Sequence, residues 1–258
     1  MFGWLKKVTG GARKNIAPPV PAGLHPEDVP GPALERLCAP ITFRQPANID
    51  PFASMFGTVR LARKDEPWPT HAHEPLWPLC QLNLTHAPLR PDALHNVSLI
   101  TVFIAPQHAE APTYIIDTRM PDPNATWALR SYPTLQDLTI PQNPAHGSTL
   151  SPRLGEWGPI TPDYAGHDPA LQVADTAVHG VHANNGSGPV QQTKLGGWPA
   201  TAQSDLWWDR QKSSGTWDFV LQLSVEPAAL WQGWGDGAAY IARSRQRPHL
   251  WAIDVQFT

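Results

Sequence analysis

The feature that most constrains this chain is an internal repeat of short sequence blocks. Leu79–Leu84 and Val220–Val225 share the order apolar, apolar, glutamine, leucine, small polar, apolar. A glycine-containing block precedes each of them at similar spacing, at Met55–Thr58 and at Lys194–Gly197. Blocks in the same order at similar spacing predict two diverged copies of one motif.

Further blocks extend the repeat toward the end of each copy. They are Phe103–Ala105 and Tyr114–Asp117 in the first copy, and Tyr240–Ala242 and Trp251–Asp254 in the second. The spacing from the aromatic residue to the aspartate is the same in both copies. We therefore assign the first repeat to about residues 52–120 and the second to about 191–258.

The repeated blocks have the period of β-strands. In the first copy Cys80 and Leu82 point to one side of the chain, whereas Gln81 and Asn83 point to the other. A short helix is predicted at residues 32–38. The sequence thus predicts an α+β, predominantly β fold, in which two diverged repeats form a pseudo-twofold single domain with loop-rich insertions.

The distribution of proline and turn residues sets the domain boundaries. The chain has 30 prolines but only 16% charged residues, which favours short strands and irregular connections over long helices. Residues 1–30 are predicted to form a proline-rich arm, and residues 31–258 a single β-rich domain. Within that domain, residues 121–190 are predicted to be a loop-rich insertion.

The composition of the chain also argues against some classes of protein. A net charge of −3 argues against nucleic-acid binding, which usually needs a basic excess. No segment has the run of apolar residues needed to cross a membrane, and no secretion signal is recognisable. Cys38 and Cys80 are expected to be reduced and buried. We therefore expect a cytoplasmic protein with no nucleic-acid or membrane partner.

Several motifs carry a resemblance to a known family. The second-half motifs are Lys194–Pro199, Leu221–Leu223 and Trp234–Gly237, and the first-half motifs are Phe56–Thr58, Trp68-Pro69 and Leu79–Leu82. Together they resemble the signature of the YwqG-like bacterial proteins, a domain of unknown function. The resemblance implies a β-rich duplicated fold and brings no established activity, cofactor or catalytic residue. Some relatives resemble proteins encoded beside secreted bacterial toxins, which implies an immunity role.

Most residues of these motifs have a structural interpretation. A glutamine on a strand can satisfy loop backbone through its amide, so we expect Gln81 and Gln222 to hold the turns at Gly57 and Gly196. The glycines around Asp236 suit a tight turn before a strand. The proposed structural residues are Gly57, Gln81, Gly196, Gly197, Gln222, Trp234, Gly235, Asp236 and Gly237.

The histidines raise the alternative of a metal-dependent hydrolase. His71 and His73 would lie on the same face of a strand, and His179 and His182 form a second pair. A metal site needs three or four convergent ligands, and no motif joins the two pairs. We expect no metal and no cofactor.

Motifs of nucleophilic catalysis are absent from the sequence, so we expect no catalytic residues. Adjacent tryptophans on a strand would face opposite ways, which would expose one of them as an anchor for a protein partner. The predicted partner-binding residues are Trp207, Trp208, Asp205 and Asp209. The function predicted is a non-enzymatic binding protein, in its sharpest form an immunity protein that neutralises a cognate toxin. A small-molecule-binding or glycan-binding protein is a further alternative.

Overall fold

The computed structural model describes residues 35–46, 50–105, 113–120, 122, 125–141, 148–164, 192–201, 206–210, 217–229 and 237–256. The predicted proline-rich arm at residues 1–30 lies outside these ranges. Within them the protein is mostly β, as expected. Helical structure there is limited to short segments. They are α2 (Trp207–Arg210), η2 (Leu84–His86), η3 (Asp92–Leu94) and η5 (Pro227–Ala229).

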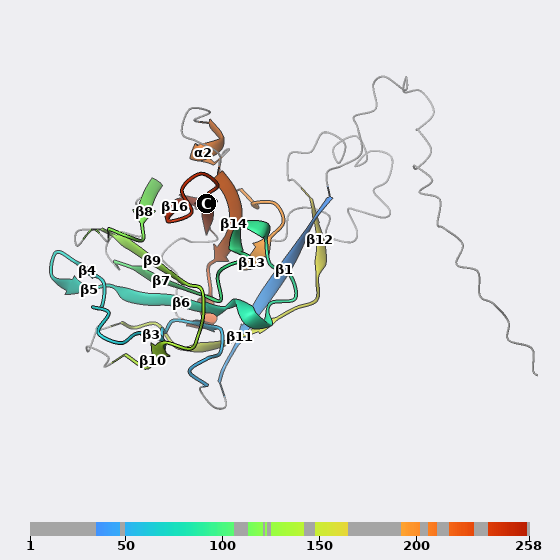
Figure 1. Cartoon of the computed structure of the whole chain (residues 1–258). Coiled ribbons are helices and arrows are strands. Elements are labelled where there is room, and N and C mark those ends of the chain that lie inside the picture. The colour runs from blue at the N-terminus through green and yellow to red at the C-terminus, as the bar shows by residue number, and fades with distance from the viewer. Residues whose placement is uncertain are drawn as a thin grey trace, which may run out of the picture.

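One twelve-stranded antiparallel sheet forms the body of the protein (Figure 1). Its strands are β1 (Glu35–Arg44), β2 (Met55–Phe56), β6 (Trp77–Asn83), β7 (Leu99–Ile104), β8 (Thr113–Asp117), β9 (Trp127–Tyr132), β11 (Arg153–Trp157), β12 (Thr161–Tyr164), β13 (Lys194–Gly196), β14 (Trp217–Ser224), β15 (Ala238–Ser244) and β16 (Leu250–Gln256). The strand order is β8-β16-β15-β14-β13-β1-β11-β2-β6-β7-β9, and β12 also pairs with β1. Two small ladders join β3 (Ala62–Arg63) to β10 (Leu138–Thr139) and β4 (Thr70–His71) to β5 (Glu74–Pro75).

The sheet curls until its two ends almost meet. β8 and β9 are the last strands of the ladder, yet some of their Cα atoms lie within 8 Å of one another. Curling encloses a core to which both halves of the chain contribute, including Leu82 and Val102 from the first half and Leu221 and Ile253 from the second. Every residue of β7, β15 and β16 is buried, so these strands are mostly apolar on both faces. Their buried polar residues are Thr101, Arg243, Ser244, Asp254 and Gln256.

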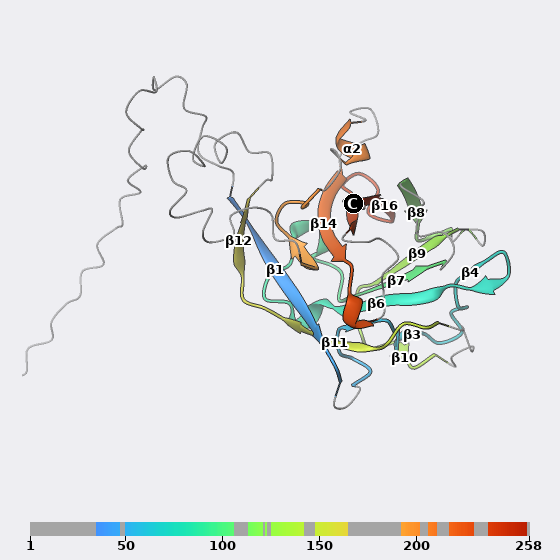
Figure 2. The same ribbon diagram turned by 180° about the vertical axis from the view of Figure 1, so that it is seen from behind.

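β1 lies in the middle of the ladder and links the two groups of strands (Figures 1 and 2). It pairs with β13 on one side, and with β11 and β12 on the other. The helix predicted at residues 32–38 is therefore wrong where it overlaps Glu35–Cys38. A weak helical preference is outweighed by pairing along the whole strand, which continues into the strand-forming residues Ile41, Thr42 and Phe43.

The segment predicted as a loop-rich insertion, residues 121–190, supplies part of the sheet. It contains β9, β11 and β12, as well as β10 of a small ladder. β11 and β12 are short and partly exposed, so their apolar alternation is weak and turn residues dominate the pattern. β9 is longer and buries Trp127, Leu129 and Tyr132. No helix among the described residues combines the length and the apolar character that spanning a bilayer requires.

Candidate binding cleft between the two ends of the sheet

A cleft of about 390 Å³ lies where the sheet fails to close, between β8 and β9. Consecutive residues of each strand line it, Ile115–Asp117 from β8 and Trp127–Arg130 from β9. The segment Glu66–Thr70, which leads into the β4–β5 hairpin, forms a further wall. The volume lies within the range of binding pockets for small ligands and side chains.

The apolar wall of the cleft is organised around Trp68. Its indole Nε1 donates a hydrogen bond to the Leu76 carbonyl at 2.9 Å. Its ring meets Phe103 edge-on, with ring centroids 5.0 Å apart. This fixes the indole in the wall, next to the buried side chains of Leu76 and Leu129, which also line the cleft.

A polar network on the β9 side joins this wall to the sheet. Arg130 Nε lies 3.4 Å from Glu66 Oε1, and the Tyr132 hydroxyl donates to Glu66 Oε2 at 2.7 Å. The Arg130 guanidinium also donates to the Pro67 carbonyl. Burial raises the pKa of Tyr132, which keeps its hydroxyl protonated as a donor to the carboxylate. The network holds the segment at Glu66 and Pro67 against β9.

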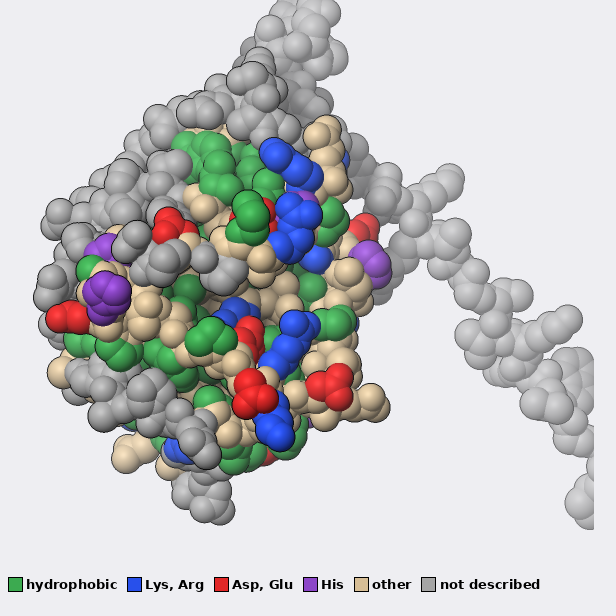
Figure 3. Space-filling model, turned by 60° about the vertical axis from the view of Figure 1, so that its left-hand side comes forward, with side chains coloured by type: hydrophobic (Ala, Val, Ile, Leu, Met, Phe, Trp, Pro, Cys, Tyr) green, Lys and Arg blue, Asp and Glu red, His purple; other side chains and the backbone are tan. Residues whose placement is uncertain are grey.

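The β8 side carries Asp117 and two exposed apolar side chains. Arg119 donates to the Asp117 carboxylate from both its side chain and its backbone, which lowers the pKa of Asp117 and keeps it ionised. The side chains of Ile115 and Met120 are 52% and 72% exposed. Figure 3 shows one face of the molecule, on which acidic and basic side chains lie beside one another and alternate with apolar ones.

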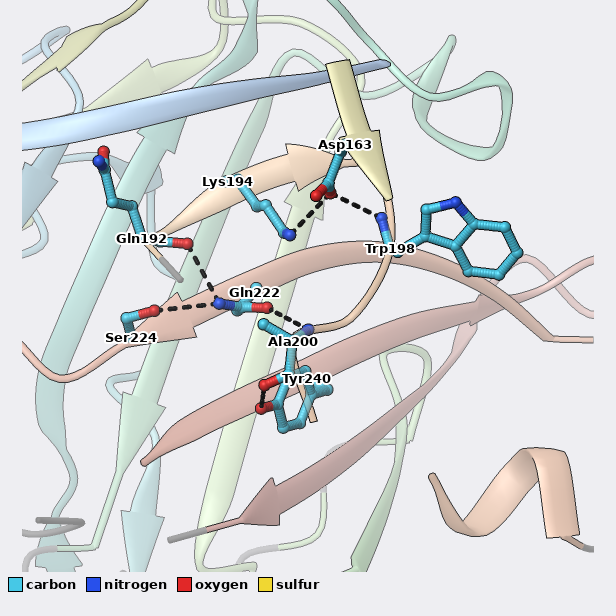
Figure 4. A network of polar contacts seen from close by, with 8 residues as sticks. All are labelled: Asp163, Gln192, Lys194, Trp198, Ala200, Gln222, Ser224 and Tyr240. Atoms are coloured by element: carbon cyan, nitrogen blue, oxygen red, sulfur yellow. Dashed lines mark hydrogen bonds and ion pairs between the residues drawn. The ribbon is translucent and has the colours of Figure 1, made fainter. Parts of the chain in front are cut away.

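A second network lies inside the other half of the sheet (Figure 4). Lys194 Nζ on β13 lies 2.7 Å from Asp163 Oδ2 on β12, and both side chains are fully buried. The same carboxylate oxygen accepts the backbone N–H of Trp198 at 2.8 Å. A Cβ atom at Gly197 would lie 1.9 Å from this oxygen, so the tight φ = +71° turn requires glycine. Burial lowers the pKa of Lys194, and the Asp163 carboxylate opposes that shift.

Cys38 packs beside this ion pair. Burial and the nearby Asp163 carboxylate raise the pKa of its thiol to about 11. Burial also raises the pKa of the Cys80 thiol. Both cysteines are free and buried, as expected from the sequence, and both are held in the unreactive protonated form.

The two repeated glutamines hold equivalent turns, as the sequence predicted. Gln81 Oε1 accepts from the Leu61 N–H, and its Nε2 donates to the Ala53 carbonyl. Gln222 Oε1 accepts from the Ala200 N–H, and its Nε2 donates to the Gln192 carbonyl. In each case the partners lie four residues before and four residues after a glycine with positive φ. Those glycines are Gly57 and Gly196.

Trp207 and Trp208 are not exposed on a strand. They form the turn α2 and are only 5% and 4% exposed. The Trp207 backbone N–H donates to Asp254 Oδ2 at 2.9 Å, and its indole Nε1 donates to the Ile253 carbonyl. The α-helical turn packs both rings inward, whereas a strand would have pointed them apart.

Several predicted residues lie outside the described structure. Asp205, Trp234, Gly235 and Asp236 fall outside the described residues, as does the side chain of Asp209. Gly237 is buried, and its carbonyl accepts the Val225 N–H at 3.3 Å.

The histidine pair His71 and His73 does not lie on one strand face. Ala72 and His73 have φ of 48° and 72° and form the two-residue turn between β4 and β5. His179 and His182 lie outside the described residues. Among the residues that the structure does describe, no cluster of three His, Cys, Asp or Glu side chains could hold a metal ion.

The sequence interpretation missed the cleft and the partner of Lys194. Trp68 appeared in it only as part of a family motif, although a tryptophan flanked by two prolines, Pro67 and Pro69, indicates a fixed loop position. Asp163 lies in the segment predicted as an insertion, and its contact with Lys194 depends on how distant strands pair.

Comparison with family models identifies the family of this chain. A family model described as Domain of unknown function (DUF1963) matches residues 54–246. The chain belongs to the DUF1963 family. No curated protein matches it. Membership confirms the expected relationship to a domain of unknown function, whereas the YwqG-like name stays a prediction. The DUF1963 match spans β2 to β15 and includes both the cleft and the buried Lys194–Asp163 pair.

Proposed function

We propose that this DUF1963 protein is a non-enzymatic, cytoplasmic binding protein, and that a protein partner docks at the cleft between β8 and β9. The observation that carries the proposal is the incomplete closure of the sheet, which leaves a cleft of about 390 Å³ beside the exposed side chains of Ile115 and Met120. Exposed apolar side chains around an aromatic-lined hollow are typical of protein contact sites.

The form of this function that we favour is neutralisation of a toxin. It is supported by the resemblance to YwqG-like proteins, some of whose relatives resemble proteins encoded beside toxins. Inhibition would then be steric, with this protein covering the active site of the toxin over an interface of ordinary size.

We further propose that the fold arose by duplication around a pseudo-twofold axis between β1 and β11. The strand order β16-β15-β14-β13-β1-β11-β2-β6-β7-β9 places β13 and β2, β14 and β6, and β15 and β7 at matching distances from that centre. The register supports this, because Lys194 lies opposite Gln222 as Met55 lies opposite Gln81. The block at Tyr114–Asp117 does not fit, because β8 pairs directly with β16 instead of matching it.

The function is tested by affinity purification of the full tagged chain from its native cells, followed by co-expression with any stoichiometric partner. We expect the partner to be toxic alone and harmless in the complex. Met120→Glu should weaken the complex by at least about tenfold, because it places a charge at the cleft. Ile140→Glu is the matched control, since Ile140 is 60% exposed and does not line the cleft.

Two results would overturn the proposal. One is a preparation without a stoichiometric protein partner. The other is an unchanged affinity of the Met120→Glu protein. The volume of the cleft and the indole of Trp68 in its wall favour a small-molecule ligand as the second candidate, and ligand-dependent quenching of tryptophan fluorescence would reveal it.

A further inference from the structure

The pairing of β8 with β16 determines which backbone N–H and C=O groups of β8 point away from β16. The Thr118 N–H donates to the His249 carbonyl at 3.0 Å, which makes these opposite residues a hydrogen-bonded pair. Such pairs alternate with non-bonded pairs along an antiparallel ladder. Ile116 therefore also bonds to β16, whereas Ile115 and Asp117 direct their N–H and C=O groups away from it.

The backbone groups of β8 that point away from β16 lie at the cleft. Ile115 and Asp117 both line it, and within the described residues no hydrogen bond reaches the backbone N–H or C=O of Ile115. On the opposite side, the Ala105 N–H donates to the Thr126 carbonyl, so the same alternation turns the backbone of Leu129 toward the cleft. The outward-facing edges of two strands thus border one hollow.

The spacing of these edges limits what can enter. A strand hydrogen-bonded to both would need them roughly 9.5 Å apart. Some Cα atoms of β8 and β9 are within 8 Å, and both ribbon views show β8 standing at a steep angle to β9 (Figures 1 and 2). An added strand can therefore pair with only one edge. The edge of β8 is the accessible one, because Ile115 is 52% exposed and Leu129 is buried.

We propose that an extended segment of the partner protein adds to the edge of β8 as a further strand. This inference rests on the proposed protein-binding function and names the form of its ligand. Backbone hydrogen bonds to the N–H and C=O of Ile115 and to the N–H of Asp117 would supply affinity, since the Asp117 carbonyl already accepts the Met120 N–H at 3.2 Å. An apolar side chain of the segment would enter the cleft beside Trp68. The cleft lining has three carboxylates, on Glu66, Asp117 and Asp122, against one guanidinium, on Arg130. Two of these carboxylates are already paired, Glu66 with Arg130 and Asp117 with Arg119, so the apolar lining decides which side chain enters the cleft.

The test uses a displayed library of short random linear peptides, selected against the full chain. We expect enriched peptides that carry an apolar residue at a common position. Ile115→Pro removes the outward N–H and places a ring against the incoming strand, so peptide affinity should fall at least about tenfold. Ile115→Thr is the matched control, because it keeps the N–H, and its affinity should change less than about threefold. Proline is tolerated on an edge strand, and far-ultraviolet circular dichroism verifies that both variants fold.

Amide hydrogen exchange gives a second readout that does not depend on any variant. When an enriched peptide binds, the amides of Ile115 and Asp117 should become protected. The amide of Ile116 already bonds to β16 and should change little. Absence of enriched peptides, equal affinity of the two Ile115 variants, or protection confined to other strands would overturn strand addition.

The experiments distinguish a failure of the protein-binding proposal from a failure of the strand-addition proposal. If the native partner is lost with Met120→Glu but retained with Ile115→Pro, the cleft binds a partner and strand addition is wrong. If no native partner exists, peptide selection still decides whether the edge of β8 accepts a strand.

Discussion

Lys194 Nζ lies 2.7 Å from Asp163 Oδ2 in a part of the sheet where neither side chain has any solvent-exposed surface. The pair connects β13 to β12 across the end of β1, with which both strands pair. A buried ion pair is costly to form, but removing one partner costs more, because the remaining charge is left without compensation.

Lys194→Met should therefore destabilise the protein by about 3–5 kcal/mol. Methionine suits the position, because Met55 occupies the matching place opposite Gln81. Adding Asp163→Asn removes the stranded charge and keeps an acceptor for the Trp198 N–H, so the double variant should recover at least half of the loss. Urea denaturation measures both. Equal stability of the single and double variants would show that charge is not the cause.

Trp207→Ala should destabilise the protein by about 3–5 kcal/mol, the range typical for removing a buried aromatic side chain. The Trp207 ring is 5% exposed and packs against Trp208 and Trp217. The comparison is Trp198→Ala, at a half-buried ring over which the Arg36 guanidinium stacks, where a smaller loss is expected. If Trp207→Ala left stability unchanged and removed partner binding, the anchoring role predicted from the sequence would stand instead.

The Cys38 thiol should make stability depend on alkaline pH. Its pKa is raised from 9.0 to about 11 in the folded state, so between these values the unfolded chain binds fewer protons than the folded one. The contribution of the protonated Cys38 thiol to the free energy of unfolding is fully present below pH 9 and decreases as the pH rises toward 11. The difference in unfolding free energy between the natural protein and Cys38→Ala should therefore shrink across this window. A difference that stays constant from pH 8 to 11 would refute the assignment.

His73→Gly should stabilise the β4–β5 hairpin. His73 has φ of 72°, a conformation that costs a residue with a Cβ roughly 1–2 kcal/mol and glycine almost nothing. Part of this gain is offset by the greater entropy of glycine in the unfolded chain, so about 0.5–1 kcal/mol should remain. Thermal unfolding measures it, with Glu74→Gly as the control that should destabilise, because Glu74 lies in a strand. A lower melting temperature for His73→Gly would contradict the turn geometry.

The parts of the fold that could be predicted from the sequence are those set by local pattern. Gln81 and Gln222 recur within similar strand blocks, and one amide side chain on a strand can reach only nearby loop backbone. Their roles around Gly57 and Gly196 therefore followed from spacing alone.

The parts that could not be predicted depend on how distant segments meet. Asp163 contacts Lys194 only because β12 and β13 pair with the same strand, β1. The cleft exists because β8, which follows β7 in the chain, pairs with β16 near the C-terminus. The strand predicted for Trp207 and Trp208 was wrong for a local reason, since two adjacent aromatic residues suit a strand and a helical turn almost equally well.

The place of β1 in the ladder has a consequence for biosynthesis. Ile41 pairs with Trp157, and Ala39 pairs with Leu195, so during synthesis β1 waits for most of the rest of the chain before it has both neighbours. Contacts so far apart in sequence carry a large loop-closure entropy and slow folding. A nascent chain that ends before β11 would present β1 with both edges open, a form that invites association with other chains. We therefore expect β1 to complete its pairing only after translation has passed β13, and chaperone contact with β1 to be longest before that point.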